Sequence, residues 1–182
     1  MDKFDNKYRI TSARLKGWNY SSIGAYFITI CTHNFQPFFG RVYDCEMYLS
    51  EIGKIAEEHW IEIPNHFPFI ILDRFVIMPN HIHGILILNE SEEHNIVHIR
   101  KEEFHTEKSK AMSDISPKPG SISTIIRSYK SIVTKNARSI DESFVWQPRF
   151  HDHIIRNNQS FNNIQNYIEN NPRNWNESKF YI

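Results

Sequence analysis

Two histidines one residue apart stand at the start of an apolar run. His81 and His83 flank Ile82, follow a Pro79-Asn80 turn and precede residues 84–88, which are Gly-Ile-Leu-Ile-Leu. In a strand, residues i and i+2 project from the same face, so both imidazoles would point together while Ile82 faces the packed side. Imidazole is a common ligand of divalent metals. The pair therefore predicts half of a metal site.

The sequence offers two ways to complete that site. His151 and His153 repeat the same spacing, and four histidines together would indicate a transition-metal site such as zinc. Alternatively, Tyr167 and Asn171 are four residues apart and share a helix face next to Pro172, so an amide oxygen and a phenol would reach outwards together. Tyr167 also continues an apolar helical stripe, and a purely structural role in the core is the simpler interpretation of that residue alone.

The alternation of hydrophobic periods predicts the elements that position these residues. A first strand at 26–32 has a short hairpin partner at Phe38–Val42. The expected elements that follow are a helix over Leu49–Ile63 with Ser50 as N-cap and Pro64 as its end, strands over Phe69–Ile77 and Ile82–Leu88, a helix over Ser121–Ala137, a strand over Phe144–Arg156, and a last helix over Asn158–Asn171. This order predicts an α+β, ferredoxin-like antiparallel sheet with helices on one face, plus a C-terminal helix that carries Tyr167.

Length and composition set the remaining bounds. A chain of 182 residues predicts a single domain over residues 1–182. Lys plus Arg equals Asp plus Glu at 21 each, so net charge selects no class of partner, although residues 1–20 form a mildly basic arm. Residues 89–118 are charged and poor in large apolar side chains, which predicts a mobile surface loop.

Cysteine usage and hydropathy indicate where the protein works. Cys31 and Cys45 are the two cysteines and form no CxxC pattern, which is typical of a reducing compartment without disulfides. The chain has no apolar stretch of membrane-spanning length and no hydrophobic signal core at its start. We therefore expect a soluble, cytoplasmic protein with no membrane partner.

Several stretches resemble the REP-associated tyrosine transposases, which belong to the single-tyrosine HUH transposases of the insertion-sequence superfamily. The matching stretches are residues 15–34, 76–84, 126–131, 146–156 and 167–172, and the match covers nearly all of the chain except the 89–118 loop and the tail. The resemblance implies a metal-dependent transposase and endonuclease that acts on single-stranded DNA bearing a hairpin, through a 5′-phosphotyrosine intermediate.

The resemblance also assigns roles to individual residues. It implies Tyr167 as nucleophile and His81, His83 and Asn171 as ligands of a divalent cation, magnesium or manganese, with no organic cofactor. Imidazole ligands by themselves favour a softer metal. The other residues that the resemblance involves are His153 near the metal or the DNA, Arg9, Arg14 and Lys16 at the foot of the hairpin, and Arg127 and Lys130 along the DNA.

Two other functions stay open on the sequence. One is a catalytically silent module that binds DNA hairpins, and the other is a histidine-rich zinc hydrolase using His81, His83, His151 and His153. Either a monomer or a homodimer is compatible with the sequence, and so is a tyrosine that acts within its own chain or on a partner. The sequence does not identify the DNA sequence recognised, nor whether the protein still moves DNA.

Overall fold

A four-stranded antiparallel sheet forms the centre of the molecule, in a computed structural model that describes residues 3–4, 7–8, 20–90 and 119–181. Its strand order is β6-β7-β3-β8. The strands are β3 (Gly24–Cys31), β6 (Ile70–Met78), β7 (His81–Leu88) and β8 (His151–Ile155). With helical segments between β3 and β6 and between β7 and β8, this is the ferredoxin-like order predicted from the sequence.

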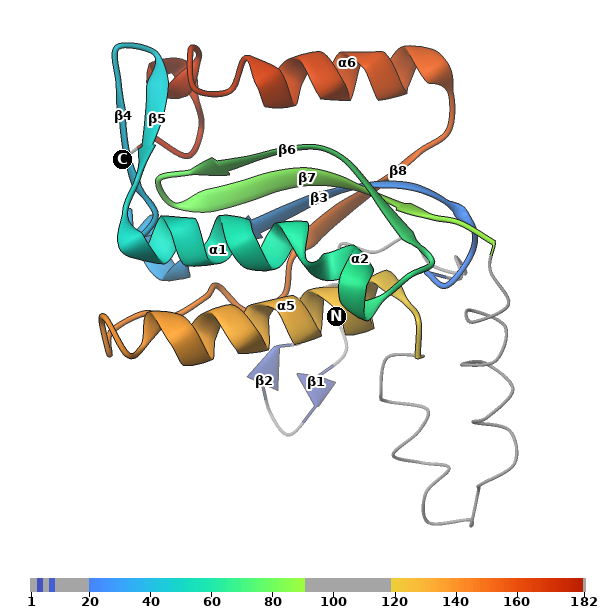
Figure 1. Cartoon of the computed structure of the whole chain (residues 1–182), viewed down its shortest axis with the longest axis horizontal. Helices are drawn as coiled ribbons and strands as arrows, with labels where there is room; N and C mark the ends of the chain where they lie inside the picture. Colours follow the sequence, from blue (N-terminus) through green and yellow to red (C-terminus); the bar gives the residue numbers. More distant parts are fainter. Residues whose placement is uncertain (1–2, 5–6, 9–19, 91–118, 182) are drawn as a thin grey trace.

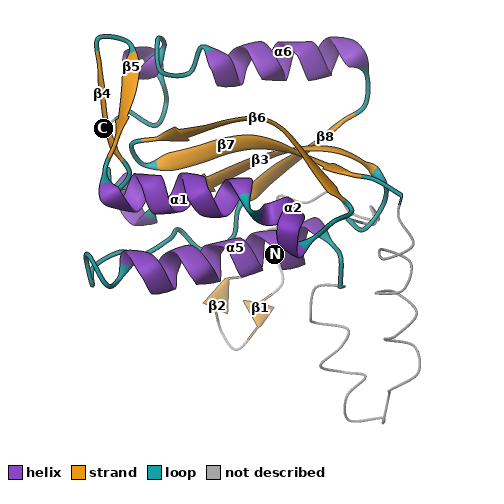
Figure 2. Cartoon of the chain, in the orientation of Figure 1, coloured by secondary structure: helices purple, strands orange, loops and turns teal. Residues whose placement is uncertain are grey.

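Helices cover both faces of this sheet. On one side lie α1 (Glu51–Ile61) and α5 (Ile122–Ala137), with the short α2 (Ile63–His66) beside them, and on the other side lies α6 (Asn158–Glu169) (Figure 1). The shorter elements are the strand pairs β1 (Lys3–Phe4) with β2 (Lys7–Tyr8) and β4 (Gly40–Tyr43) with β5 (Glu46–Leu49), and the 3-10 turns η1 (His33–Phe35) and η2 (Trp175–Glu177) (Figure 2). The structure is thus a ferredoxin-like core with an additional helix that carries Tyr167, which agrees with the expected fold class.

The alternation of the strands separates two packed layers. In β7, Ile82 and Leu86 face α1 and α5 and are fully buried with Ile28 and Trp60. His81 and His83 project from the opposite face, toward α6. The larger core therefore supports the histidine strand from behind and leaves its other face to the site.

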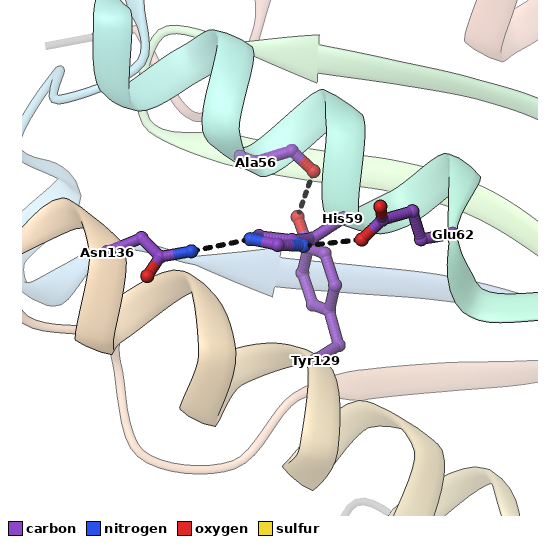
Figure 3. A network of polar contacts seen from close by, with 5 residues as sticks. All are labelled: Ala56, His59, Glu62, Tyr129 and Asn136. Carbon is purple, nitrogen blue, oxygen red and sulfur yellow. Dashed lines mark hydrogen bonds and ion pairs between the residues drawn. The ribbon is translucent and has the colours of Figure 1, made fainter. Parts of the chain in front are cut away.

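A polar network connects the two helices of the larger layer. His59 of α1 lies between Glu62, 2.8 Å from its Nδ1, and the side-chain amide of Asn136, which donates to its Nε2 at 2.7 Å (Figure 3). The buried Tyr129 hydroxyl of α5 donates to the Ala56 carbonyl at 2.8 Å. These contacts set how α5 docks on α1.

Replacing Tyr129 by Phe tests this docking. We expect Tyr129→Phe to lower the free energy of unfolding by about 1 kcal/mol, because one buried hydrogen bond is lost while the aromatic packing stays. Urea unfolding followed by circular dichroism measures this difference. A change near zero would mean that the hydroxyl adds nothing to the packing of the ring against Trp60.

Most expected boundaries lie within two residues of those in the structure, but the following expectations differ by more or in kind. Phe38–Val42 does not pair with the first strand: Gly40–Tyr43 pairs with Glu46–Leu49, a strand that the sequence analysis does not predict. Pro64 is expected to end the helix, but it lies in the first turn of a second short helix, α2. A proline is tolerated there because the N–H that it lacks has no partner within the helix. The strand expected from Phe144 begins only at His151, and Asn171, expected within the last helix, lies beyond its end at Glu169.

The late start of β8 has a local cause. Arg149 has φ of 69°, in the left-handed region that interrupts a strand, and Pro148 before it cannot donate a ladder hydrogen bond. Trp146 keeps only an isolated bridge to Thr32. Another strand is also irregular, since the register of β6 against β7 shifts between Leu72 and Phe75.

Candidate active site

The tyrosine helix and the histidine strand meet within one chain. The Tyr167 hydroxyl lies 3.2 Å from His83 Nε2. The Phe27 ring of β3 packs against both side chains, edge-on against Tyr167 at 6.1 Å and against His83 at 5.1 Å between centroids. Tyr167 is 43% exposed and His83 is 2% exposed, so the phenol marks the open side of the pair.

The surroundings of His83 decide which ring nitrogen carries the proton. His83 Nδ1 lies 2.9 Å from the Thr29 hydroxyl, and the backbone of Ile28 raises the pKa of the ring against the lowering by burial. A phenol is a stronger hydrogen-bond donor than an aliphatic hydroxyl, so we assign the Tyr167 hydroxyl as the donor to Nε2 and place the ring proton on Nδ1, which donates to the Thr29 oxygen. The Nε2 lone pair then faces Tyr167, whose hydroxyl donates to it.

His81 is oriented by its neighbour in the turn. The Asn80 side-chain amide donates to the backbone carbonyls of Phe35 at 3.1 Å and Phe180 at 2.8 Å, which fixes the direction of that amide. Asn80 Oδ1 must therefore accept from His81 Nδ1, 2.8 Å away. Like His83, His81 is left with an unprotonated Nε2.

Two buried acceptors are left without partners at this point. Among the described residues, neither His81 Nε2 nor Asn171 Oδ1 has a hydrogen-bond partner. The two groups are close enough for Asn171 to raise the pKa of His81, but they do not form a well-aligned hydrogen bond. Buried polar atoms are rarely left unsatisfied, and two acceptors facing one another are suited to a shared cation. The residue types and their arrangement thus fit a divalent metal ion.

Burial keeps both imidazoles neutral. Desolvation lowers the pKa of His83 to about 3, with a further contribution from the Lys179 ammonium. Desolvation, followed by the charge of His83, also lowers the pKa of His81 well below its ordinary value. Both imidazoles are therefore neutral at neutral pH, as metal ligation requires, and a metal at His83 Nε2 would take the place of the hydrogen bond from Tyr167.

Aromatic rings of the C-terminal segment pack against His81. The Phe180 ring lies 4.1 Å from the His81 ring and the Trp175 ring 5.9 Å from it, between centroids. The sequence analysis does not predict these contacts, and the only signal for them is the aromatic residues in an otherwise polar tail. His81 is thus closed off on this side, and the site opens toward Tyr167.

The shifted pKa of His83 predicts a pH dependence of stability. Between pH 6.5 and about 3 the unfolded chain binds a proton at this histidine that the folded chain does not, so stability falls as the pH falls through this window. On going from pH 7 to pH 5, we expect the free energy of unfolding to fall less in His83→Gln than in the native chain. Urea unfolding without added metal measures both values. Equal losses in the two proteins would contradict the assignment of a neutral, buried His83.

The other histidine pair singled out in the sequence lies on the neighbouring edge strand and is not part of the cluster around Tyr167. His153 and His151 are exposed on β8 and line a groove with Phe27. The described residues contain no group of three or more His, Cys, Asp or Glu side chains placed to hold a metal, so the four-histidine zinc site does not form among them.

The two basic residues of α5 lie away from the His83–Tyr167 pair. Arg127 is exposed on a helix that covers the opposite face of the sheet. The Lys130 ammonium donates to the carbonyls of Gln147 at 2.8 Å and Arg149 at 3.0 Å, and burial lowers its pKa to about 8. Lys130 thus anchors the segment before β8, and DNA contacts by these two residues stay a prediction.

Arg9, Arg14 and Lys16 lie outside the described residues, as does residue range 91–118, which includes most of the predicted loop. In the part of the chain that the structure describes, no helix is long and apolar enough to cross a membrane.

Comparisons with known proteins agree with this architecture. No family model matches the chain. An uncharacterized protein of Haemophilus influenzae is 38% identical over 174 residues, which is 94% of this chain and 92% of the relative. A solved structure described as a REP-associated tyrosine transposase bound to a REP hairpin is 20% identical, with a TM-score of 0.56, covering 95% of this chain and 76% of the other.

A second solved structure, of a candidate transposase from Deinococcus radiodurans R1, is 13% identical with a TM-score of 0.44, covering 86% of this chain and 95% of the other. The expected fold is confirmed by the first of these structures. The chain belongs to the family of the Haemophilus influenzae protein, and its fold is that of the REP-associated tyrosine transposases.

Proposed function

We propose that this protein is a metal-dependent transesterase of single-stranded DNA, of the transposase type, which nicks and rejoins strands beside hairpin repeats. The observation that carries the proposal is the position of the Tyr167 hydroxyl, 3.2 Å from His83 Nε2, next to the unpartnered His81 Nε2 and Asn171 Oδ1. The fold shared with a protein described as bound to a REP hairpin supports DNA as the substrate class.

His81, His83 and Asn171 would hold the cation, magnesium or manganese. When bound, a divalent ion supplies positive charge against the oxygens of the scissile phosphate. Two imidazole nitrogens with one amide oxygen suit manganese better than magnesium, because magnesium prefers an all-oxygen shell. Asn80 and Thr29 orient the two rings so that both lone pairs point into the site.

Tyr167 supplies the nucleophile. Its oxygen forms a bond to phosphorus as its proton passes to solvent water, the bond from phosphorus to the 3′ oxygen breaks, and the released 3′ oxygen takes up a proton from water. The product is a 5′-phosphotyrosine with a free 3′-hydroxyl. A 3′-hydroxyl of a second strand then attacks the same phosphorus and releases Tyr167, so the strands are joined without ATP.

The proposal is tested by trapping the covalent intermediate. The protein is incubated with an end-labelled single strand bearing a hairpin, with magnesium or manganese, and a denaturation-resistant adduct is sought. An adduct that requires the metal supports the proposal. Binding without an adduct supports the catalytically silent hairpin-binding module, and an absence of affinity for single strands overturns both.

A further inference from the structure

We propose that a groove beside Tyr167 binds a nucleobase of the single strand next to the scissile phosphate, an inference that rests on the proposed function. The groove has a volume of about 510 Å³ and lies between the edge strand β8 and the first turns of α6. This volume is within the usual range for small-molecule sites. Its walls include Phe27, Ile164, His151, His153, Asn157 and Asn163.

The groove adjoins the candidate active site through Phe27. Phe27 forms part of its wall and also packs on His83 and, edge-on, on Tyr167. Asn163 and Ile164 line it from positions three and four residues before Tyr167, which is one turn earlier on the same face of α6. A strand whose phosphate reaches Tyr167 therefore places an adjoining nucleotide at the groove.

The lining fits a base rather than a phosphate. It combines an aromatic ring and an aliphatic side chain with amides, imidazoles and a hydroxyl, and it includes no Lys, Arg, Asp or Glu. A phosphate would be expected to draw arginine or lysine. A base offers a flat face for stacking and an edge of hydrogen-bond donors and acceptors, which is what these side chains can meet.

The side chains of the groove form hydrogen bonds with one another. Asn157 caps α6 by accepting from the Ser160 backbone N–H at 2.8 Å. The Gln159 side-chain amide donates to Asn163 Oδ1 at 2.9 Å. Among the described residues, the Asn163 amide hydrogens and the Gln159 amide oxygen then remain as a neighbouring donor and acceptor. Paired donor and acceptor atoms of this kind match the edge of a base.

A fluorescent base reports on the groove directly. The full chain carrying Tyr167→Phe, which blocks cleavage, is titrated with hairpin-bearing single strands that contain 2-aminopurine at one flanking position at a time. We expect a change of emission at one position. Asn163→Ala should weaken binding by roughly fivefold to a hundredfold, the range of an amide–base contact. Asn162→Ala, an exposed neighbour outside the groove, serves as the matched control.

The outcomes separate this inference from the proposed function. Equal effects of Asn163→Ala and Asn162→Ala, or no position-dependent emission, would overturn the groove as a base site. A loss of self-association in Asn163→Ala without a loss of DNA affinity would also overturn it, in favour of contact between two copies. If the native chain forms no covalent adduct but Asn163 still controls the emission, the proposed chemistry fails and the base site stands.

Discussion

Tyr167→Phe is expected to lower the yield of the covalent DNA adduct by at least about 10³-fold, since removal of a nucleophile eliminates the chemical step itself. The fold should be unaffected, because Tyr167 is 43% exposed and a phenylalanine keeps the edge-on contact with Phe27. Affinity for the hairpin-bearing strand should therefore remain. The measurement is denaturing electrophoresis of the labelled adduct with either metal.

Tyr48→Phe is the matched control for this prediction. Tyr48 is a comparably exposed tyrosine on the β4–β5 hairpin, and it should form the adduct at the native rate after the same change. An adduct that persists in Tyr167→Phe would place the nucleophile on another residue. An equal loss in both variants would show that the effect is not specific to the position beside His83.

Much of this site was predictable because it depends on local periodicity. The i, i+2 spacing of His81 and His83 predicts a shared face once residues 81–88 form a strand, and the structure confirms this. The helical stripe that includes Ile164 and Ile168 places Tyr167 on a helix that packs on the sheet. The order of strands and helices then brings that helix above the histidines.

The remaining features depend on contacts between distant residues. Thr29 becomes the partner of His83 only through the register of β3 against β7, and a spacing within one segment does not reveal a register. Phe180 reaches Asn80 across 100 positions of sequence. The boundary of β8 was missed because it depends on a left-handed residue, Arg149, that is neither glycine nor asparagine.

The strongest test of the cation site is substitution of Asn171, the amide that follows the tyrosine helix. Asn171 is buried, its Oδ1 has no hydrogen-bond partner among the described residues, and it lies near the free Nε2 of His81. If this oxygen is a ligand, Asn171→Ala should weaken manganese binding by at least about tenfold, because changes to groups that only support metal ligands already have effects of that size. Isothermal titration with the metal alone measures this without DNA.

Two further variants separate a ligand from a structural amide. Asn170→Ala changes the adjacent amide, which donates to the Asn166 carbonyl, and should leave metal affinity unchanged. Asn171→Asp replaces a neutral oxygen by a carboxylate, a ligand that magnesium and manganese prefer, and should tighten binding. If Asn171 has only a structural role, Asn171→Asp should instead lower the stability of the chain and leave the metal affinity no higher, because it adds a buried charge. Tighter binding in Asn171→Asp together with weaker binding in Asn171→Ala would therefore identify this oxygen as a ligand.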